Sequence, residues 1–145
     1  MDEPTKVINS RTSKKRPLVW RRRQGVTSGT IFTTYERPSL ADNRPVLLPG
    51  GAEDTFNLGR LILSIAAAFS HNPRAARYDS LWLAQTVEEQ LFIDSVDLTP
   101  PTIAQATYTV LRRFDELAAI QYAAKHHLIT SVRRRGRPST THRLS

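Results

Sequence analysis

Residues 21–36 read RRRQGVTSGTIFTTYE and decide the fold of the N-terminal part of the chain. Three consecutive arginines lead into a segment marked by Gly25 and Gly29, and glycine permits the positive φ angles that a tight turn requires. The β-branched and aromatic residues from 31 to 35 alternate between two sides, as in a strand with one covered face. The stretch therefore predicts a basic strand, a turn and a second strand.

The residues before this stretch add a third strand. Residues 5–11, TKVINSR, include β-branched side chains, and the polar, basic residues 12–16 indicate a loop. Leu18 and Trp20 then share one face of the strand that continues into the arginines. A sheet of three short strands is marginal alone, so it needs a metal, a partner surface or a neighbouring domain.

The positive charge of the chain is concentrated at its two ends. Of 145 residues, 21 are Lys or Arg and 13 are Asp or Glu, which gives a net charge of +8. Residues 1–37 hold nine Lys or Arg against three acids, and residues 131–145 hold five Arg and no acid, so residues 38–130 are mildly acidic. This distribution indicates a polyanionic partner, most often nucleic acid. The alternative is that the basic ends only keep a small protein soluble.

The composition argues against several classes of protein. The chain has no cysteine, which excludes disulfides and thiolate metal sites. The N-terminus lacks the pattern of a secretory signal, and the apolar run within residues 61–69 is too short to span a bilayer, so a cytoplasmic protein is expected. No catalytic constellation is found, because nothing activates Ser28, and Glu88 and Glu89 are interpreted as helix surface. An enzyme is therefore not expected.

Residues 38–130 predict an α-rich domain of about four helices. Prolines and glycines interrupt residues 38–55, apart from a short strand at 46–48. Asn57 is the expected cap of the first helix. Apolar residues at helical spacing predict helices over residues 56–70, 80–92 and 102–114, and another from a break near Asp115 to about residue 129. The side chains expected in the core are Leu61, Ile65, Phe69, Leu81, Ala84, Val87, Leu91, Ile103, Ala106, Val110, Phe114, Leu117, Ile120 and Ala124.

The order TKVINSR, RRR, a glycine-containing turn and FTTYER resembles the zinc-ribbon module of the bacterial transcriptional repressor of ribonucleotide reductase genes. That ribbon carries two C-x-x-C pairs, the second between R-R-R and F-T-T-Y-E. Laying FTTYE over residues 32–36 without a gap puts Gly25 and Ser28 at the positions of the second pair, and only residues 1–4 precede the match to TKV. Because thiolates on zinc normally hold this fold together, a ribbon in this chain must stand without metal.

The following segment resembles the second module of the same family, the ATP-cone, a nucleotide-sensing domain. Aligned on Phe56, the family pattern V-x-K-R-D-G-x-x-x-[PE]-F-[DN]-x-x-K-[IL] matches Val46, Gly51, Asn57 and Leu61. The stretch LRRFDELAAIQYAAKH at 111–126 is similar to a later family pattern. The resemblance implies an α+β fold with three parts, which are a degenerate zinc-ribbon-like module in residues 1–37, an ATP-cone-like domain in residues 38–130 and a basic tail in residues 131–145.

The resemblance also implies ATP or dATP as a ligand, with Val46 and Arg60 as its contacts. A triphosphate needs cations beside it, but the K-R-D positions of the family read Leu48, Pro49 and Gly50 here. Either the cone binds a nucleotide through Arg60 and an apolar base pocket, or it is a scaffold that has lost its ligand. We favour the scaffold, and we expect no zinc.

The basic residues of the ribbon predict contacts with duplex DNA. Arg21 and Arg23 alternate with Arg22 along a strand, so Arg21 and Arg23 reach the same phosphate run while Arg22 faces the other side. The preceding loop adds Lys14, Lys15 and Arg16. The alternative is a basic face that is merely solvated.

The C-terminal tail contains a sequence that looks like the core of an AT-hook. This sequence consists of Arg134, Arg135, Gly136, Arg137 and Pro138. Glycine lets an extended backbone enter the narrow A·T minor groove, where the flanking arginines meet its negative potential, and Pro138 keeps the exit extended. The alternative is a generic polybasic tail, and in either case the tail is expected to be disordered without DNA.

Together these features predict a DNA-binding transcriptional regulator with double-stranded DNA as its partner. The resemblance further implies a homo-oligomer that forms through the ATP-cone. Two alternatives stay open: a nucleotide-sensing or protein-interaction module that does not touch DNA, and a nonspecific nucleoid-like protein that binds all duplexes alike.

Overall fold

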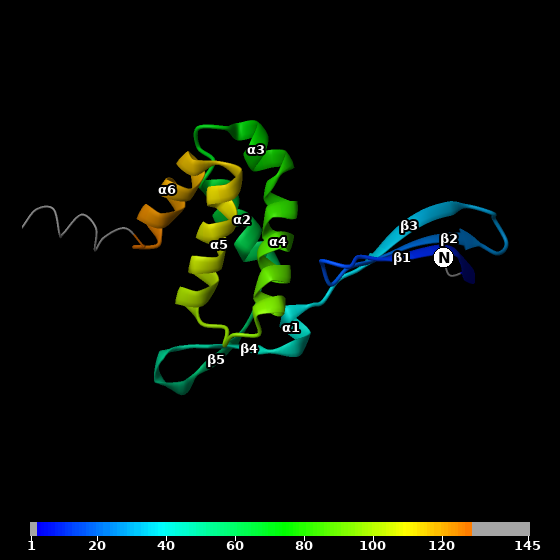
Figure 1. Cartoon of the computed structure of the whole chain (residues 1–145), viewed down its shortest axis with the longest axis horizontal. Coiled ribbons are helices and arrows are strands. Elements are labelled where there is room, and N and C mark those ends of the chain that lie inside the picture. Colours follow the sequence, from blue (N-terminus) through cyan, green and yellow to red (C-terminus); the bar gives the residue numbers. More distant parts are fainter. Residues whose placement is uncertain (1–2, 129–145) are drawn as a thin grey trace, which may run out of the picture.

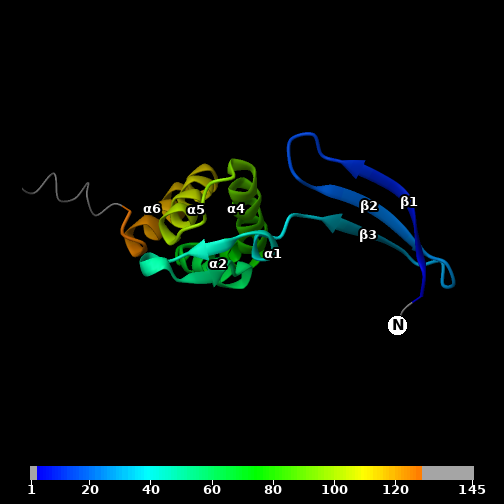
Figure 2. The ribbon, with the colours of Figure 1, turned by 90° about the horizontal axis from the view of Figure 1, so that it is seen from below.

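The computed structural model describes residues 3–128, which form a three-stranded sheet followed by a helical domain (Figure 1). The fold is α+β, as the sequence predicts. Two views at right angles show the sheet extending away from the helices, and no helix of the described residues covers either face of the sheet (Figures 1 and 2).

The sheet consists of β1 (Thr5–Thr12), β2 (Val19–Gly25) and β3 (Ile31–Glu36), in that order and antiparallel throughout. The register of β1 shifts at a β-bulge between Val7 and Asn9. The three predicted strands are confirmed. Of residues 3–37, only Gly25 is buried, so the sheet has no apolar core of its own.

A short hairpin follows the sheet. After α1 (Leu40–Asn43), β4 (Pro45–Leu47) pairs antiparallel with β5 (Glu53–Thr55), and a 3₁₀ turn, η1 (Pro49–Gly51), joins them. Val46 also forms a parallel bridge with Leu98, which holds the hairpin against the helices. The predicted strand at 46–48 is confirmed with a shift of one residue. The sequence did not predict α1 or β5, because elements this short carry no periodicity.

Five helices complete the described part of the chain. They are α2 (Leu58–Ala67), α3 (Pro73–Tyr78), α4 (Ser80–Asp94), α5 (Pro100–Phe114) and α6 (Glu116–Lys125). Side chains cap the N-termini of α2, α5 and α6: Asn57 accepts from Arg60 N, Thr99 and Thr102 form a capping box, and Asp115 accepts from Ala118 N. The four longer helices confirm the prediction, although α6 ends about four residues early, and α3 was not predicted. None of the described helices is both long and apolar enough to cross a membrane.

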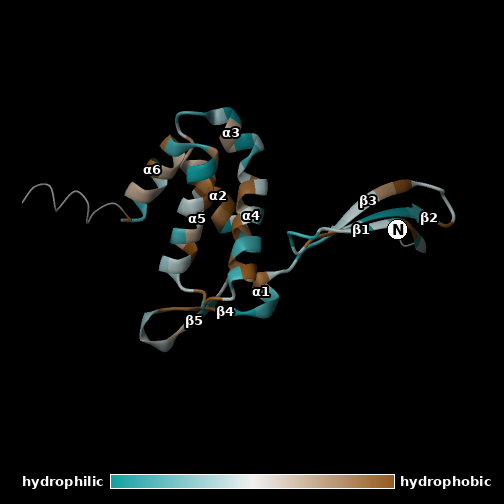
Figure 3. Ribbon diagram, in the orientation of Figure 1, coloured by the Kyte–Doolittle hydropathy of each residue, from teal (hydrophilic) through white to brown (hydrophobic). Residues whose placement is uncertain are grey.

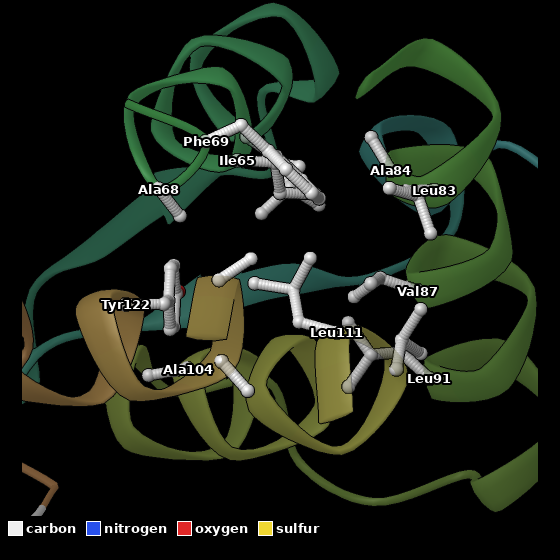
Figure 4. Packing of buried hydrophobic residues seen from close by; sticks show 14 of the residues in the cluster. Ile65, Ala68, Phe69, Leu83, Ala84, Val87, Leu91, Ala104, Leu111 and Tyr122 are labelled. Atoms are coloured by element: carbon white, nitrogen blue, oxygen red, sulfur yellow. The ribbon is translucent and has the colours of Figure 1, made fainter. Parts of the chain in front are cut away.

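The hydrophobic core lies between α2, α4, α5 and α6 (Figure 4). Its largest fully buried side chains include Phe69 and Ile65 near the end of α2, Leu83 and Leu91 on α4, and Leu111 on α5. Burying a side chain of this size stabilises the fold by about 1.5–3 kcal/mol. The helical domain therefore holds itself together by apolar packing.

Several residues predicted to be buried are in fact exposed. Leu81 at the start of α4 is 52% exposed and Phe114 at the end of α5 is 41% exposed. In α6 the prediction of Leu117, Ile120 and Ala124 as core was wrong. The buried residues are Ala118, Ala119, Tyr122 and Ala123. Alanines let α6 approach its neighbours closely, so packing selects that face although seven of the ten residues of α6, ELAAIQYAAK, are apolar or aromatic. Figure 3 shows hydrophobic and hydrophilic residues along the helices and the sheet.

Candidate nucleic-acid interface

Antiparallel pairing sorts the side chains of the sheet into two faces. Residues directly opposite one another on neighbouring strands share a face. The first face, here called the Arg21 face, comprises Thr5, Val7, Ser10, Thr12, Val19, Arg21, Arg23, Phe32, Thr34 and Glu36. The second, the Trp20 face, comprises Lys6, Asn9, Arg11, Trp20, Arg22, Gln24, Ile31, Thr33 and Tyr35. Arg21 and Arg23 thus lie on one face and Arg22 on the other, as the alternation predicted.

The two arginines of the Arg21 face are held by neighbouring side chains. Arg21 Nε donates to Glu36 Oε1 at 2.7 Å, and Arg21 Nη1 donates to Ser10 Oγ at 3.2 Å. Arg23 Nε donates to Thr5 Oγ1 at 3.1 Å. These bonds fix both guanidinium groups in position, but Glu36 neutralises part of the positive charge of this face.

The Trp20 face carries three cations, Lys6, Arg11 and Arg22, and none of its nine residues is acidic. No described acidic side chain forms an ion pair with these cations; Arg22 Nη1 only donates a long bond to Thr33 Oγ1 at 3.4 Å. Sequence reasoning missed Lys6 and Arg11. Counting alternate residues along β1 would have placed Lys6 on this face. The bulge between Val7 and Asn9 shifts the alternation, so the same counting would not have placed Arg11 beside Trp20.

The predicted contact residues in the loop between β1 and β2 divide into two groups. Lys14 and Lys15 are exposed to solvent. Arg16 instead reaches the helical domain, where its Nε and Nη2 donate to Glu89 Oε1 and Oε2 at 2.8 and 3.0 Å. Arg16 therefore forms a bidentate ion pair with Glu89, although part of its side chain stays exposed.

Glu89 connects the sheet to the helices through ion pairs with Arg16 and Arg37, and this set of contacts is here called the Glu89 joint. Its side chain is 5% exposed and also accepts from Arg37 Nη1 at 2.7 Å. The neighbouring Glu88 accepts from Leu40 N at 3.0 Å, and burial raises the pKa of its carboxyl group. The expectation that Glu88 and Glu89 form a helix surface was wrong. Both are buried in α4, because the loop before β2 and the segment after β3 lie over them.

Gly25 and Ser28, which align with zinc-binding cysteines of the zinc-ribbon family, cannot coordinate zinc as thiolates do. The chain has no cysteine, and no group of three or more His, Asp or Glu residues within 3–128 could hold a metal. A carboxylate occupies the place instead. Glu3 Oε1 accepts from Ser28 N at 3.0 Å, and Ser28 Oγ donates to Glu3 Oε2 at 2.5 Å. A Cβ atom at Gly25 would lie 1.8 Å from Glu3 Oε2, so a cysteine there would displace this carboxylate.

Glu3, Ser28 and the backbone groups beside them, here called the Glu3 cluster, link the start of β1 to the turn between β2 and β3. Val26 N donates to Pro4 O at 2.9 Å and Thr30 N donates to Ser28 Oγ at 3.2 Å, which extends the same contact. The hydrogen bond from the Ser28 hydroxyl lowers the pKa of Glu3, so the carboxylate is ionised at neutral pH. Hydrogen bonds thus make the connection for which the ribbon family uses metal.

The predicted nucleotide contacts lie at one cavity in the helical domain. The cavity, of about 330 Å³, is lined by Val46 and Leu48 from the hairpin, by Phe56 and Arg60, and by residues of α5 and α6. Tyr122 and His126 stack there with ring centroids 4.0 Å apart. The lining is mainly apolar, so it suits an uncharged, apolar group rather than an anion.

The described lining of the cavity carries little positive charge for a triphosphate. Among its described lining residues Arg60 is the only permanent cation, and its Nη1 lies 3.9 Å from Asp54 Oδ2. Burial lowers the pKa of His126, so its ring is neutral at pH 7. The described lining thus offers a triphosphate one cation that already lies beside an acid. The predicted residues Arg134, Arg135, Gly136, Arg137 and Pro138 lie outside the described residues.

Comparison with known proteins gives one consistent result. No model of a protein family matches the chain. Curated proteins named transcriptional repressor NrdR do match. The protein from Thermus thermophilus is 28% identical over 130 residues, covering 90% of this chain and 82% of the relative. The one from Deinococcus radiodurans is 28% identical, with 90% and 80% covered, and the one from Frankia casuarinae is 30% identical, with 88% and 68% covered.

Proposed function

Because the chain belongs to the family of the transcriptional repressor NrdR, we propose that it is a regulator of transcription that binds duplex DNA through its N-terminal sheet. We assign DNA binding to residues 1–37, a cone-like domain to residues 38–130 and a basic tail to residues 131–145. The relatives are transcriptional repressors and not enzymes. A regulator of this kind acts where the chromosome is, so we propose a cytoplasmic location.

One observation carries the proposal: the sheet is basic and neither of its faces is used for folding. Residues 1–37 hold nine Lys or Arg, and of the described part of this segment only Gly25 is buried. Side chains that do not pack in a core are available to a ligand. Cations on adjacent same-face positions of a strand stand about 7 Å apart, so β2 can contact several phosphates along one backbone.

The joint at Glu89 supports a role for the helical domain in positioning the sheet. Two arginines from the ends of the sheet, Arg16 and Arg37, converge on this one buried carboxylate. Because Arg16 and Arg37 reach the buried Glu89 from two different segments, the two ion pairs restrict rotation of the sheet relative to the helical domain. In a DNA-binding dimer or larger oligomer, such a restriction fixes the spacing of the bound sites.

The test is a fluorescence-anisotropy titration of A·T-rich and G·C-rich duplexes with the full chain. The variant Arg21→Ala/Arg22→Ala/Arg23→Ala is expected to bind both duplexes much more weakly than the unchanged chain. The matched control, Arg77→Ala/Arg112→Ala/Arg113→Ala, removes the same charge from exposed positions of the helical domain and is expected to bind as the unchanged chain does. Equal losses in both variants would mean that only total charge matters, which is the nonspecific nucleoid-like alternative.

The predicted AT-hook core at residues 134–138 adds a second contact to the proposal. A chain that ends at residue 130 is expected to bind both duplexes more weakly and to lose any preference for the A·T-rich one. If the preference remains, the sheet rather than the tail reads the sequence.

For the cavity at Val46 and Arg60 we propose a scaffold role without a triphosphate ligand. The paired Arg60 and the apolar lining support this reading. ATP and dATP are therefore expected to leave the melting temperature unchanged, whereas a ligand that binds the folded state raises it. A rise at saturating nucleotide, lost in Arg60→Ala, would overturn the scaffold reading and restore ATP or dATP as a ligand.

We also propose that the helical domain self-associates. Trp82 and Phe114 form an edge-to-face pair with centroids 5.4 Å apart, and both remain more than a third exposed. Exposed aromatic pairs are common in interfaces between proteins. Phe114→Glu is expected to reduce the oligomer mass in light scattering, while Tyr78→Glu, at an exposed aromatic outside this pair, is expected to leave it unchanged.

A further inference from the structure

The Trp20 face of the sheet combines positive charge with two aromatic rings, of which Tyr35 is exposed and Trp20 is half-buried. We infer that this face binds single-stranded nucleic acid, with Trp20 and Tyr35 stacking on unpaired bases and with Lys6, Arg11 and Arg22 contacting the phosphates. This inference goes beyond the binding of duplex DNA proposed above.

The residues of the Trp20 face lie in three rows across the strands. The rows are Lys6, Gln24 and Ile31; Asn9, Arg22 and Thr33; and Arg11, Trp20 and Tyr35. Neighbouring strands are about 4.8 Å apart and successive rows about 7 Å apart. Each row contributes one cation, so positive charge runs along the whole face rather than gathering at one end.

The charge of this face suits a polyanion without competition from the protein itself. None of the nine residues is an acid, whereas the Arg21 face contains Glu36 paired to Arg21. Polar groups of Asn9, Gln24 and Thr33 stand between the cations, and they can donate to phosphate or base edges.

The aromatic rings distinguish single strands from duplexes. Trp20 and Tyr35 are directly opposite each other, neither belongs to the buried core, and Tyr35 is 55% exposed. Arg37 Cζ lies 5.5 Å from the centroid of the Tyr35 ring, while its Nη1 is paired to Glu89, so Arg37 holds the ring rather than adding a free cation. Every unpaired base offers a flat face for stacking on such rings. In a duplex these faces are already stacked on each other, so the rings add little there.

The first test compares the affinity of the full chain for labelled oligothymidylate and oligouridylate with its affinity for a duplex of equal length. The oligonucleotides have about ten nucleotides, a length that one small domain covers. The full chain is expected to bind both single strands more tightly than the duplex, and the two strands separate DNA from RNA as the source of the ligand. Replacing both rings, as Trp20→Ala/Tyr35→Ile, is expected to weaken single-strand binding at least about tenfold and duplex binding less than about twofold. Isoleucine keeps the strand propensity at position 35.

Two further variants separate stacking from folding. Trp20→Phe/Tyr35→Phe retains both rings and is expected to retain single-strand binding. In the full chain carrying Trp82→Phe, Trp20 is the only tryptophan, and the oligonucleotides are expected to quench its fluorescence. Absence of quenching overturns the inference, as does an equal loss of single-strand and duplex affinity in the ring-less variant. Loss of duplex binding alone would remove the proposed function and leave this inference standing.

Discussion

The helical domain and the sheet of this protein are stabilised in different ways. The helices enclose a core with fully buried side chains such as Phe69 and Leu111, whereas the described part of the sheet buries only Gly25. Backbone pairing, the Glu3 cluster and the Glu89 joint hold the sheet instead. A module that does not bury its side chains keeps both faces available for a ligand, but its stability depends on a few polar contacts.

The largest expected effect lies in the helical domain. Leu111 is fully buried, so Leu111→Ala leaves a cavity and is expected to reduce the free energy of unfolding by about 2–5 kcal/mol. Urea unfolding followed by circular dichroism at 222 nm measures it. The control is Leu81→Ala at a position 52% exposed, with an expected change below about 0.5 kcal/mol. Equal losses would mean that α4 presents a different face to the core.

The Glu89 joint is expected to give the next largest effect. Glu89→Gln leaves Arg16 and Arg37 without a charged partner, and because these arginines are 49% and 26% exposed, water can solvate them in part. A loss of about 1–3 kcal/mol is expected, below the value for a fully buried pair. Small-angle scattering should show a wider range of sheet orientations. Glu53→Gln, an exposed acid in β5, is the control, and a change of equal size there would contradict the joint.

Acidification should loosen the sheet before it affects the helical core. The pKa of Glu3 is lowered in the folded state from an ordinary value of 4.5, so its stabilising contribution is present above that value and is lost as the pH falls through the lower, folded pKa. The protection factors of the Ser28 and Val26 amides, which are exchange rates corrected for the intrinsic rate at each pH, should therefore fall as the pH drops below 4.5. In Glu3→Gln the protection factors of the two amides should be low at all pH values. If Glu3→Gln keeps the pH dependence of the unchanged chain, another carboxylate causes that dependence.

The orientation of α6 is tested by two substitutions, of which the one at Leu117 has the smallest expected effect. Leu117 is 47% exposed, and Leu117→Ser is expected to change the unfolding free energy by less than about 0.5 kcal/mol. Ala118 is fully buried, and Ala118→Leu is expected to destabilise by about 1–3 kcal/mol through overpacking. The reverse order would restore the face that the sequence pattern favoured.

Much of the fold could be predicted because local patterns decide it. The alternation of residues 31 to 35 predicted β3, and Asn57 predicted the start of α2. Arg21 and Arg23 are two positions apart in a strand, which predicted that they share a face. These features depend on residues within one turn or one strand.

Features that depend on contacts between distant residues could not be predicted. Glu89 meets Arg16 across 73 positions, and no local signal marks an acid on a helix as buried. Glu3 meets Ser28 across 25 positions. The bulge in β1 decides that Arg11 stands beside Trp20, and α6 has apolar residues on so many sides that only packing selects one.

The salt dependence of duplex binding tests the central claim most directly. Each phosphate contact that is removed lowers the slope of log K against log salt by about 0.9. For Arg21→Ala/Arg22→Ala/Arg23→Ala in the full chain, a slope smaller by about 2–3 than that of the unchanged chain is predicted, while Arg77→Ala/Arg112→Ala/Arg113→Ala should keep the original slope. An unchanged slope in the first variant would contradict DNA binding through the sheet.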